Sequence, residues 1–218
     1  MGITVQQLHV GGFDKNLSYI LYDESTATAA VVDPAGDTAL ILAGLLDQHL
    51  TLKAIYLTHT HFDHYDGLTA IVDIHGDIPI YVHTMGLSVL ETTAKLTPLK
   101  EGDQLSLGDN LIEVMHTPGH IDDAVCYFIK AKYATDGLPK VITGDTLFVG
   151  GCGRTNETRV KDLYESLQEL KALPPKTVVY PGHDYGSSPT STIGHEVATN
   201  QYYRAPNFTA FKKLRLNG

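Results

Sequence analysis

The sequence predicts a mixed α/β (α+β) fold of four layers, αββα, in which two sheets pack together and helices cover their outer faces. Short apolar segments typical of strands occur in both halves of the chain, and segments with helical spacing of leucine accompany them. With 218 residues, 43% of them hydrophobic, the chain can bury the core of one domain, residues 1–218, with a short C-terminal helix and tail after about residue 186.

The first half alternates strands and helices. Strand-like segments cover residues 4–10, 17–22, 29–33, 53–57 and 78–82. Helical patterns cover residues 38–49, 66–75 and 84–96. Pro34 and Gly36 mark the end of the third strand, and Asp37 is a good N-cap for the first helix.

The second half contains the other strand-rich group. Strand-like segments cover residues 104–107, 110–116, 125–129, 141–143 and 177–180, and Gly108-Asp109 between the first two predicts a hairpin. Helices are expected at residues 161–171 and near 192–202. The basic residues 212–215 are expected to form a frayed, solvated end, with binding of substrate carboxylates as the alternative.

Charge and cysteine content exclude several classes of protein. The formal net charge of −9 argues against a nucleic-acid partner, which needs a basic face, and against an anionic membrane surface. No apolar run reaches the roughly 20 residues of a membrane span, and the first residues do not resemble a signal peptide. Two cysteines, Cys126 and Cys152, cannot make a disulfide framework, so a cytoplasmic location is expected.

The most informative stretch is Thr58-His59-Thr60-His61-Phe62-Asp63-His64. Its three imidazoles and one carboxylate are ligands for a transition metal. His59 and His61 stand two residues apart after an apolar strand, so they can point to the same side. Asp63 and His64 follow where the chain turns into a helical pattern. The alternative is a solvated polar loop.

Three later loops carry further candidate ligands, each directly after a strand. They are Thr117-Pro118-Gly119-His120, Gly144-Asp145-Thr146 and Pro181-Gly182-His183-Asp184. Gly or Pro beside each candidate lets the backbone turn sharply toward a site at the sheet edges. Each alone is a weak signal, whereas all three after the histidine-rich stretch are a strong one.

With these motifs the sequence resembles the metallo-β-lactamase superfamily, and within it the glyoxalase II (hydroxyacylglutathione hydrolase) group most closely. The resemblance covers about residues 16–185, and its most specific parts are 58–64, 116–127, 144–154 and 180–185. It implies an αββα sandwich with two divalent metal ions at one edge, zinc with iron or manganese as alternatives. One ion would be held by His59, His61, His120 and Asp145, the other by Asp63, His64, His183 and the same, bridging Asp145.

That resemblance implies a metal-dependent hydrolase for a thioester of a small-molecule thiol, such as S-lactoylglutathione. A metal-bridging hydroxide would attack the carbonyl, and Asp63 and Asp145 would be the catalytic carboxylates. A thiol with a pKa of about 8.5 can leave as thiolate without a dedicated general acid. Asp33 is either an outer anchor for a ligand histidine or a plain turn residue.

The chain departs from glyoxalase II beyond the metal ligands. That group continues into a C-terminal helical domain, whereas only 33 residues follow Tyr185 here, and Thr155 and Asn156 replace an aromatic pair. Arg154 does match a basic residue of the family, and Tyr185 matches a glutathione-contacting tyrosine. Both are therefore candidate substrate-binding residues, while the acyl group, the thiol carrier and the oligomeric state stay open.

These departures favour an alternative, the persulfide dioxygenases, which use a single Fe(II) held by the equivalents of His59, His120 and Asp145. Such a 2-His-1-carboxylate triad leaves positions open for oxygen. A more remote alternative is a non-catalytic metal-binding scaffold or sensor. Structural zinc sites are usually closed and rich in cysteine, and no cysteine belongs to the ligand set here.

Overall fold

Two six-stranded sheets face each other in the computed structural model, which describes residues 2–90, 92 and 94–217. The first sheet has its strands in chain order: β1 (Ile3–Gly11), β2 (Asn16–Asp23), β3 (Thr28–Val32), β4 (Thr51–Tyr56), β5 (Ile80–His83) and β6 (Leu96–Leu99). β1, β2 and β3 are antiparallel neighbours, and β3 to β6 run parallel.

The second sheet has the order β14-β13-β10-β9-β8-β7. Its strands are β7 (Gln104–Leu107), β8 (Asn110–His116), β9 (Val125–Ile129), β10 (Lys140–Gly144), β13 (Val178–Pro181) and β14 (Ser191–Thr192). A small separate hairpin joins β11 (Leu147–Phe148) to β12 (Gly151–Cys152). β10 and β13 are parallel, so the residues that follow them meet at the same edge of the sheet.

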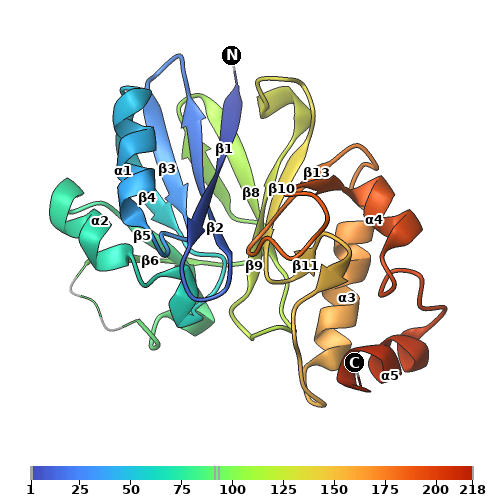
Figure 1. Ribbon diagram of the computed structural model, residues 1–218. Helices are drawn as coiled ribbons and strands as arrows, with labels where there is room; N and C mark the ends of the chain where they lie inside the picture. The colour runs from blue at the N-terminus through green and yellow to red at the C-terminus, as the bar shows by residue number, and fades with distance from the viewer. Residues whose placement is uncertain (1, 91, 93, 218) are drawn as a thin grey trace.

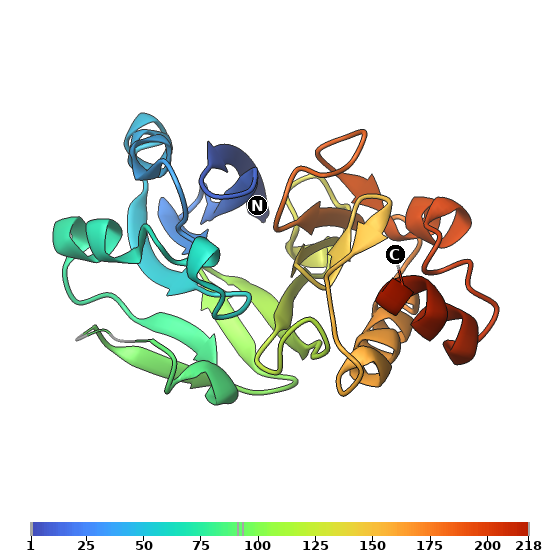
Figure 2. The same cartoon turned by 60° about the horizontal axis from the view of Figure 1, so that its bottom comes forward.

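Helices cover the outer face of each sheet (Figures 1 and 2). α1 (Thr38–Asp47) and α2 (Leu68–His75) lie outside the first sheet. α3 (Val160–Lys171), α4 (Ile193–Thr199) and α5 (Phe208–Asn217) lie outside the second. Three short 3-10 turns are η1 (Phe62–His64), η2 (Thr84–Gly86) and η3 (Ala131–Tyr133). None of the helices among the described residues has the length and apolar character needed to cross a membrane.

Three apolar layers correspond to these four layers of backbone. Alternation along β2 shows how one strand serves two of them: Tyr19 packs between the sheets, and its neighbour Ile20 packs under the helices of the first sheet. A third cluster, which includes Leu163 and Phe211, lies between the second sheet and α3–α5. The predicted αββα sandwich is thus confirmed.

Two local predictions are wrong. The helix expected over residues 84–96 is absent from the part of that segment that the structure describes, where η2, turns and the start of β6 stand instead; residues 91 and 93 lie outside the described residues. The tail expected to be frayed forms the helix α5, because Phe211 on it is fully buried against the third apolar cluster. The helix expected near residues 192–202 is the shorter α4.

Candidate metal centre

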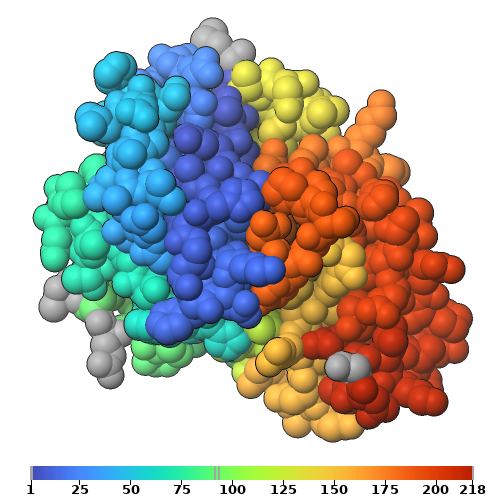
Figure 3. Space-filling model, viewed as in Figure 1, coloured from blue at the N-terminus to red at the C-terminus, as the bar shows by residue number. Residues whose placement is uncertain are grey.

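The histidine-rich stretch follows β4 of the first sheet, which ends at Tyr56, and lies at the same edge of the sandwich as the residues that follow β10 and β13 of the second sheet. The turn η1 reverses the backbone directly after His61 and so brings Asp63 and His64 back toward the same point. In the space-filling view, residues near the N-terminus, in blue, meet residues of the C-terminal half, in orange, along the middle of the molecule (Figure 3). The fold therefore gathers all the predicted ligand loops at one edge.

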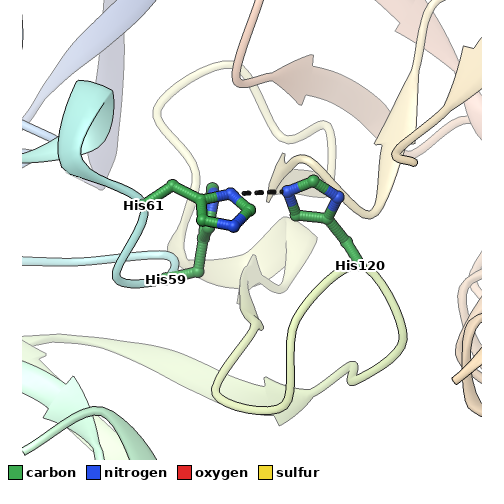
Figure 4. Close-up of side chains that lie close together, drawn as sticks. All are labelled: His59, His61 and His120. Atoms are coloured by element: carbon green, nitrogen blue, oxygen red, sulfur yellow. Dashed lines mark hydrogen bonds between the residues drawn. The ribbon is translucent and has the colours of Figure 1, made fainter. Parts of the chain in front are cut away.

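The ring nitrogens of the candidate histidines converge. His61 Nδ1 lies 3.1 Å from His59 Nε2 and 2.8 Å from His120 Nε2 (Figure 4). On the other side, His64 Nε2 lies 3.3 Å from His183 Nε2. Two nitrogens that bind one tetrahedral zinc at 2.0–2.1 Å stand about 3.3 Å apart. The spacing of these nitrogens is thus close to that of ligands around shared ions.

Asp145 lies between the two groups of histidines. Its Oδ1 is 3.4 Å from His64 Nε2, and its Oδ2 is 3.5 Å from His120 Nε2 and 3.3 Å from His183 Nε2. Asp63 Oδ2 completes the second group at 3.6 Å from His183 Nε2. Donor atoms within 4.8 Å of one another form three overlapping sets: His59, His61, His120; His59, His64, Asp145; and Asp63, His64, His183.

One atom at this point is an orphan. Asp145 Oδ1 is buried and has no hydrogen-bond partner among the described residues. A buried carboxylate oxygen is expensive to leave unpaired, and a divalent cation would satisfy it. Gly182 lets the atoms come this close, since a Cβ there would lie 2.4 Å from that same oxygen. The residues therefore fit a divalent metal.

Three of the histidines are oriented from outside the cluster. Nδ1 of His120 donates to the carbonyl of Arg154 at 2.8 Å, and Nδ1 of His183 donates to the carbonyl of Asp14 at 2.7 Å. Nδ1 of His64 donates to Asp33 Oδ2 at 2.9 Å. These carbonyl and carboxylate oxygens can only accept, so each bond places a proton on Nδ1 and turns Nε2, the atom that would bind a metal once deprotonated, toward the centre. This is the orientation a metal requires.

Asp33 is the anchor residue that the sequence left open between two interpretations. It has a positive φ of 49°, and besides His64 its carboxylate accepts from Thr58 N at 2.7 Å and Thr58 Oγ1 at 2.6 Å. It therefore ties the start of the histidine-rich stretch to its last residue. The contacts favour the outer anchor over the plain turn residue.

Asn16 makes a similar contact that the sequence did not reveal. Its buried side chain donates from Nδ2 to Asp63 Oδ2 at 3.0 Å and to the Asp63 carbonyl at 2.9 Å. Asn16 begins β2, 47 residues before Asp63. No local motif links two residues so far apart, so only the pairing of elements could show this contact.

The electrostatics of the cluster favour positive charge. Burial lowers the pKa of His59 well below its ordinary value, which keeps that ring neutral. Burial also opposes the charged form of His64, but Asp145 and Asp33 outweigh it and raise the pKa of His64 well above its usual range. Without a metal, a protonated His64 supplies part of the positive charge that the carboxylates of Asp145 and Asp33 attract. Metal has to displace that proton, so its affinity should fall as the pH is lowered.

A cavity of about 490 Å³ opens onto the cluster. Both predicted substrate-binding residues line it: Arg154, which is exposed, and Tyr185, whose ring stacks on that of His183 at 4.9 Å between centroids. The cavity is also lined by Arg215 of α5, which the sequence analysis assigned to a frayed tail. Two arginines therefore line the cavity.

Fold and site define the class of protein, and comparison with known proteins agrees. Residues 11–183 match the family model of the metallo-beta-lactamase superfamily, and the chain belongs to that superfamily. More particularly, it is 38% identical to a hydroxyacylglutathione hydrolase of Hahella chejuensis over 82% of this chain and 65% of that one. It is also 38% identical to the cytoplasmic hydroxyacylglutathione hydrolase of Arabidopsis thaliana over 81% of this chain and 67% of that one.

Two further facts qualify the likeness. The chain spans about two thirds of the length of these curated relatives. Among solved structures, it is similar to ETHE1 from Myxococcus xanthus, with a TM-score of 0.83, 29% identity, and coverage of 98% of this chain and 92% of that one. The predicted resemblance to glyoxalase II is confirmed. ETHE1, unlike the two hydroxyacylglutathione hydrolases, is matched over nearly its whole length.

Proposed function

We propose that the chain is a metal-dependent hydrolase of glyoxalase II type, which cleaves the thioester of a hydroxyacylglutathione such as S-lactoylglutathione. The observation that carries the proposal is the position of Asp145, whose carboxylate lies 3.5 Å from His120 of the first ligand set and 3.4 and 3.3 Å from His64 and His183 of the second. A carboxylate placed in this way suits a bridge between two metal ions. The two curated relatives named hydroxyacylglutathione hydrolase support the choice of substrate.

In this proposal one ion would be held by His59, His61, His120 and Asp145, and the other by Asp63, His64, His183 and Asp145. The chemistry of nitrogen and carboxylate donors suits zinc, with iron or manganese as alternatives. When bound, such a pair supplies an acidified water as nucleophile and positive charge for the oxyanion. Asp63 and Asp145 are the carboxylates closest to that chemistry.

The chain's own residues supply orientation and charge. Asp33 and Asn16 hold His64 and Asp63 in place through the hydrogen bonds described above. Arg154 and Arg215 offer the cavity two guanidinium groups, and glutathione carries two carboxylates that such groups bind. Tyr185 adds an aromatic face beside His183. The leaving thiol departs as thiolate, which needs no acid from the chain.

The likeness to ETHE1 supports the alternative of a mononuclear Fe(II) persulfide dioxygenase, with His59, His120 and Asp145 as the triad. It does not outweigh the curated relatives. His61 Nδ1 stands within 3.1 Å of both His59 and His120 nitrogens, so a fourth donor is directed at the same point as the triad. A non-catalytic scaffold or sensor is less favoured, because a large cavity opens onto the cluster.

The purified metal-loaded protein tests the proposal directly. It is expected to hydrolyse S-lactoylglutathione, which is measured as release of free thiol. With glutathione persulfide it is expected to consume no oxygen. Oxygen consumption with the persulfide and no thiol release from the thioester would establish the dioxygenase instead. Because of the low cysteine count and the relative named cytoplasmic, we place this activity in the cytoplasm.

A further inference from the structure

The wall of the cavity that carries Arg154 is held by a part of the chain outside the family match. We call residues 149–154 the substrate wall; four of its members, besides Arg154 itself, line the cavity. The family match ends at residue 183, whereas three of the side chains that bind this wall's backbone come from residues 196, 200 and 215. The C-terminal segment therefore contributes to the candidate site.

Three hydrogen bonds make this connection. Glu196 Oε2 accepts from Gly150 N at 2.9 Å, and Asn200 Nδ2 donates to the Gly151 carbonyl at 3.0 Å. Arg215 Nε donates to the Gly153 carbonyl at 2.8 Å. We call Glu196, Asn200 and Arg215 the C-terminal brace. Together they bind three backbone groups within four residues of the wall.

Two members of the brace, Glu196 on α4 and Asn200 at its C-terminal end, are buried and hydrogen-bonded. Glu196 is 0% exposed and Asn200 1%. The Glu196 carboxylate also accepts from Ser191 Oγ at 2.6 Å and from Asn200 Nδ2 at 2.9 Å. A buried carboxylate is costly unless its oxygens are hydrogen-bonded, so this network specifies one arrangement of the wall's backbone.

The wall itself has little structure of its own to hold it. Its only ladder is the two-residue pairing of β11 with β12, and Gly150 at the turn has φ of +75°. A two-stranded hairpin of this size is marginal by itself. At the far end, the Arg154 carbonyl accepts from the candidate ligand His120. The wall is thus held between the metal centre on one side and the brace on the other.

We propose that the C-terminal brace consists of positioning residues, which act through the substrate wall to keep Arg154 where it can bind the carboxylate of an anionic thiol conjugate. The substrate named in this inference depends on the function proposed above, whereas the bracing of the wall does not. The candidate ligands come from the loops after β4, β8, β10 and β13, so loss of the brace should weaken substrate binding more than metal binding.

Glu196→Ala tests this inference, with Glu196→Gln as the conservative rescue. Gln keeps an oxygen for Gly150 N and Asn200 Nδ2, and its amide can donate to Ser191 Oγ, which accepts in turn. Thr199→Ala is the matched control, because among the described residues the Thr199 hydroxyl on α4 donates only to the carbonyl of His195 in its own helix. The first readout is hydrogen exchange at residues 149–154. The alanine variant should exchange at least about tenfold faster there than the parent, the Gln variant and the control.

The second readout is kinetic. Glu196→Ala should raise KM for S-lactoylglutathione about tenfold, with kcat within about threefold and unchanged metal content, because the loss falls on binding of a charged group. A small neutral thioester should be unaffected. Exchange and KM both equal to the parent would overturn the inference. So would an equal loss on both substrates together with loss of metal, which would indicate a purely structural role.

The experiment still tests the brace if Glu196→Ala misfolds or if the proposed hydrolase function is wrong. If Glu196→Ala does not fold, Asn200→Ala removes the contact to Gly151 while Glu196 keeps its bond to Gly150, and the same two readouts apply to it. If the parent does not hydrolyse thioesters, the function proposed above fails, and faster exchange at the wall in the alanine variant still supports the brace. Unchanged exchange in that case would refute it.

Discussion

The metal-ligand edge and the substrate wall lie on the same cavity but are built in different ways. The edge consists of residues 58–64 and the residues after β8, β10 and β13, and its ligands follow directly from strand ends. The wall, residues 149–154, depends on side chains that lie 46, 49 and 62 residues further along the chain. In the first region strand order creates the site; in the second, long-range tertiary contacts hold it.

This difference suggests a division of labour. Four of the seven candidate ligands at the edge, His59, His64, Asp145 and His183, are buried, and the nitrogen and carboxylate donors there suit a divalent metal. The wall is partly exposed and is supported from a segment beyond the family match. Changes in the edge should therefore abolish metal binding and turnover together, whereas changes in the wall should alter which substrate is used.

Asp145→Ala should have the largest effect, because Asp145 faces both groups of histidines. We expect metal loss at both positions and no measurable turnover, with the fold largely intact. Metal analysis together with circular dichroism checks this. A variant that keeps two metals per chain and activity near that of the parent would show that the ligand assignment is wrong.

His64→Ala removes a ligand from only one of the two proposed positions. The variant should keep one metal of two and lose most of its hydrolase activity, since a two-metal enzyme needs the second ion. Metal content and thiol release measured on the same preparation test this. Full metal and full activity in the variant would indicate a mononuclear centre, and oxygen consumption should then be measured.

Asp33→Asn probes the outer contacts of the edge. The amide cannot accept from Thr58 and His64 as the carboxylate does, so metal affinity should fall about 10- to 100-fold, the usual cost of losing such a partner. Asp23→Asn is the matched control. Asp23 is equally buried and hydrogen-bonded, but it pairs with Thr28 at the start of β3, whereas Asp33 follows the end of that strand. Equal loss of metal affinity in both variants would mean a general loss of stability.

Arg154→Ala changes only the substrate wall, so it should affect an anionic substrate and leave a neutral one unaffected. We expect kcat/KM for S-lactoylglutathione to fall roughly 10- to 100-fold, which corresponds to about 1.5–3 kcal/mol for a hydrogen bond to a charged group. A small neutral thioester should react as before. Lys161→Ala, an exposed cation on α3, is the control. An equal loss on both substrates would assign Arg154 to support of the metal loops.

The metal-ligand edge could be predicted from the sequence, whereas the support of the substrate wall could not. The ligands could be predicted because each lies in a short motif directly after an apolar strand, and strand periodicity is a local signal. The hydrogen bonds of Asn16 to Asp63 and of Arg215 to Gly153 could not be predicted, since they join residues 47 and 62 positions apart. The helix expected over residues 84–96 is absent from the described part of that segment, where Leu87 lies in a turn, Leu90 follows it without regular structure, and both pack into the apolar cluster of the first sheet and its helices.

The central claim is a two-metal thioester hydrolase, and metal content per chain tests it most directly. Freshly purified protein should be analysed for zinc, iron and manganese separately and then assayed with S-lactoylglutathione. The account predicts two divalent ions per chain and thiol release that scales with occupancy. One iron per chain, with oxygen consumption on glutathione persulfide and no thiol release from the thioester, would contradict it.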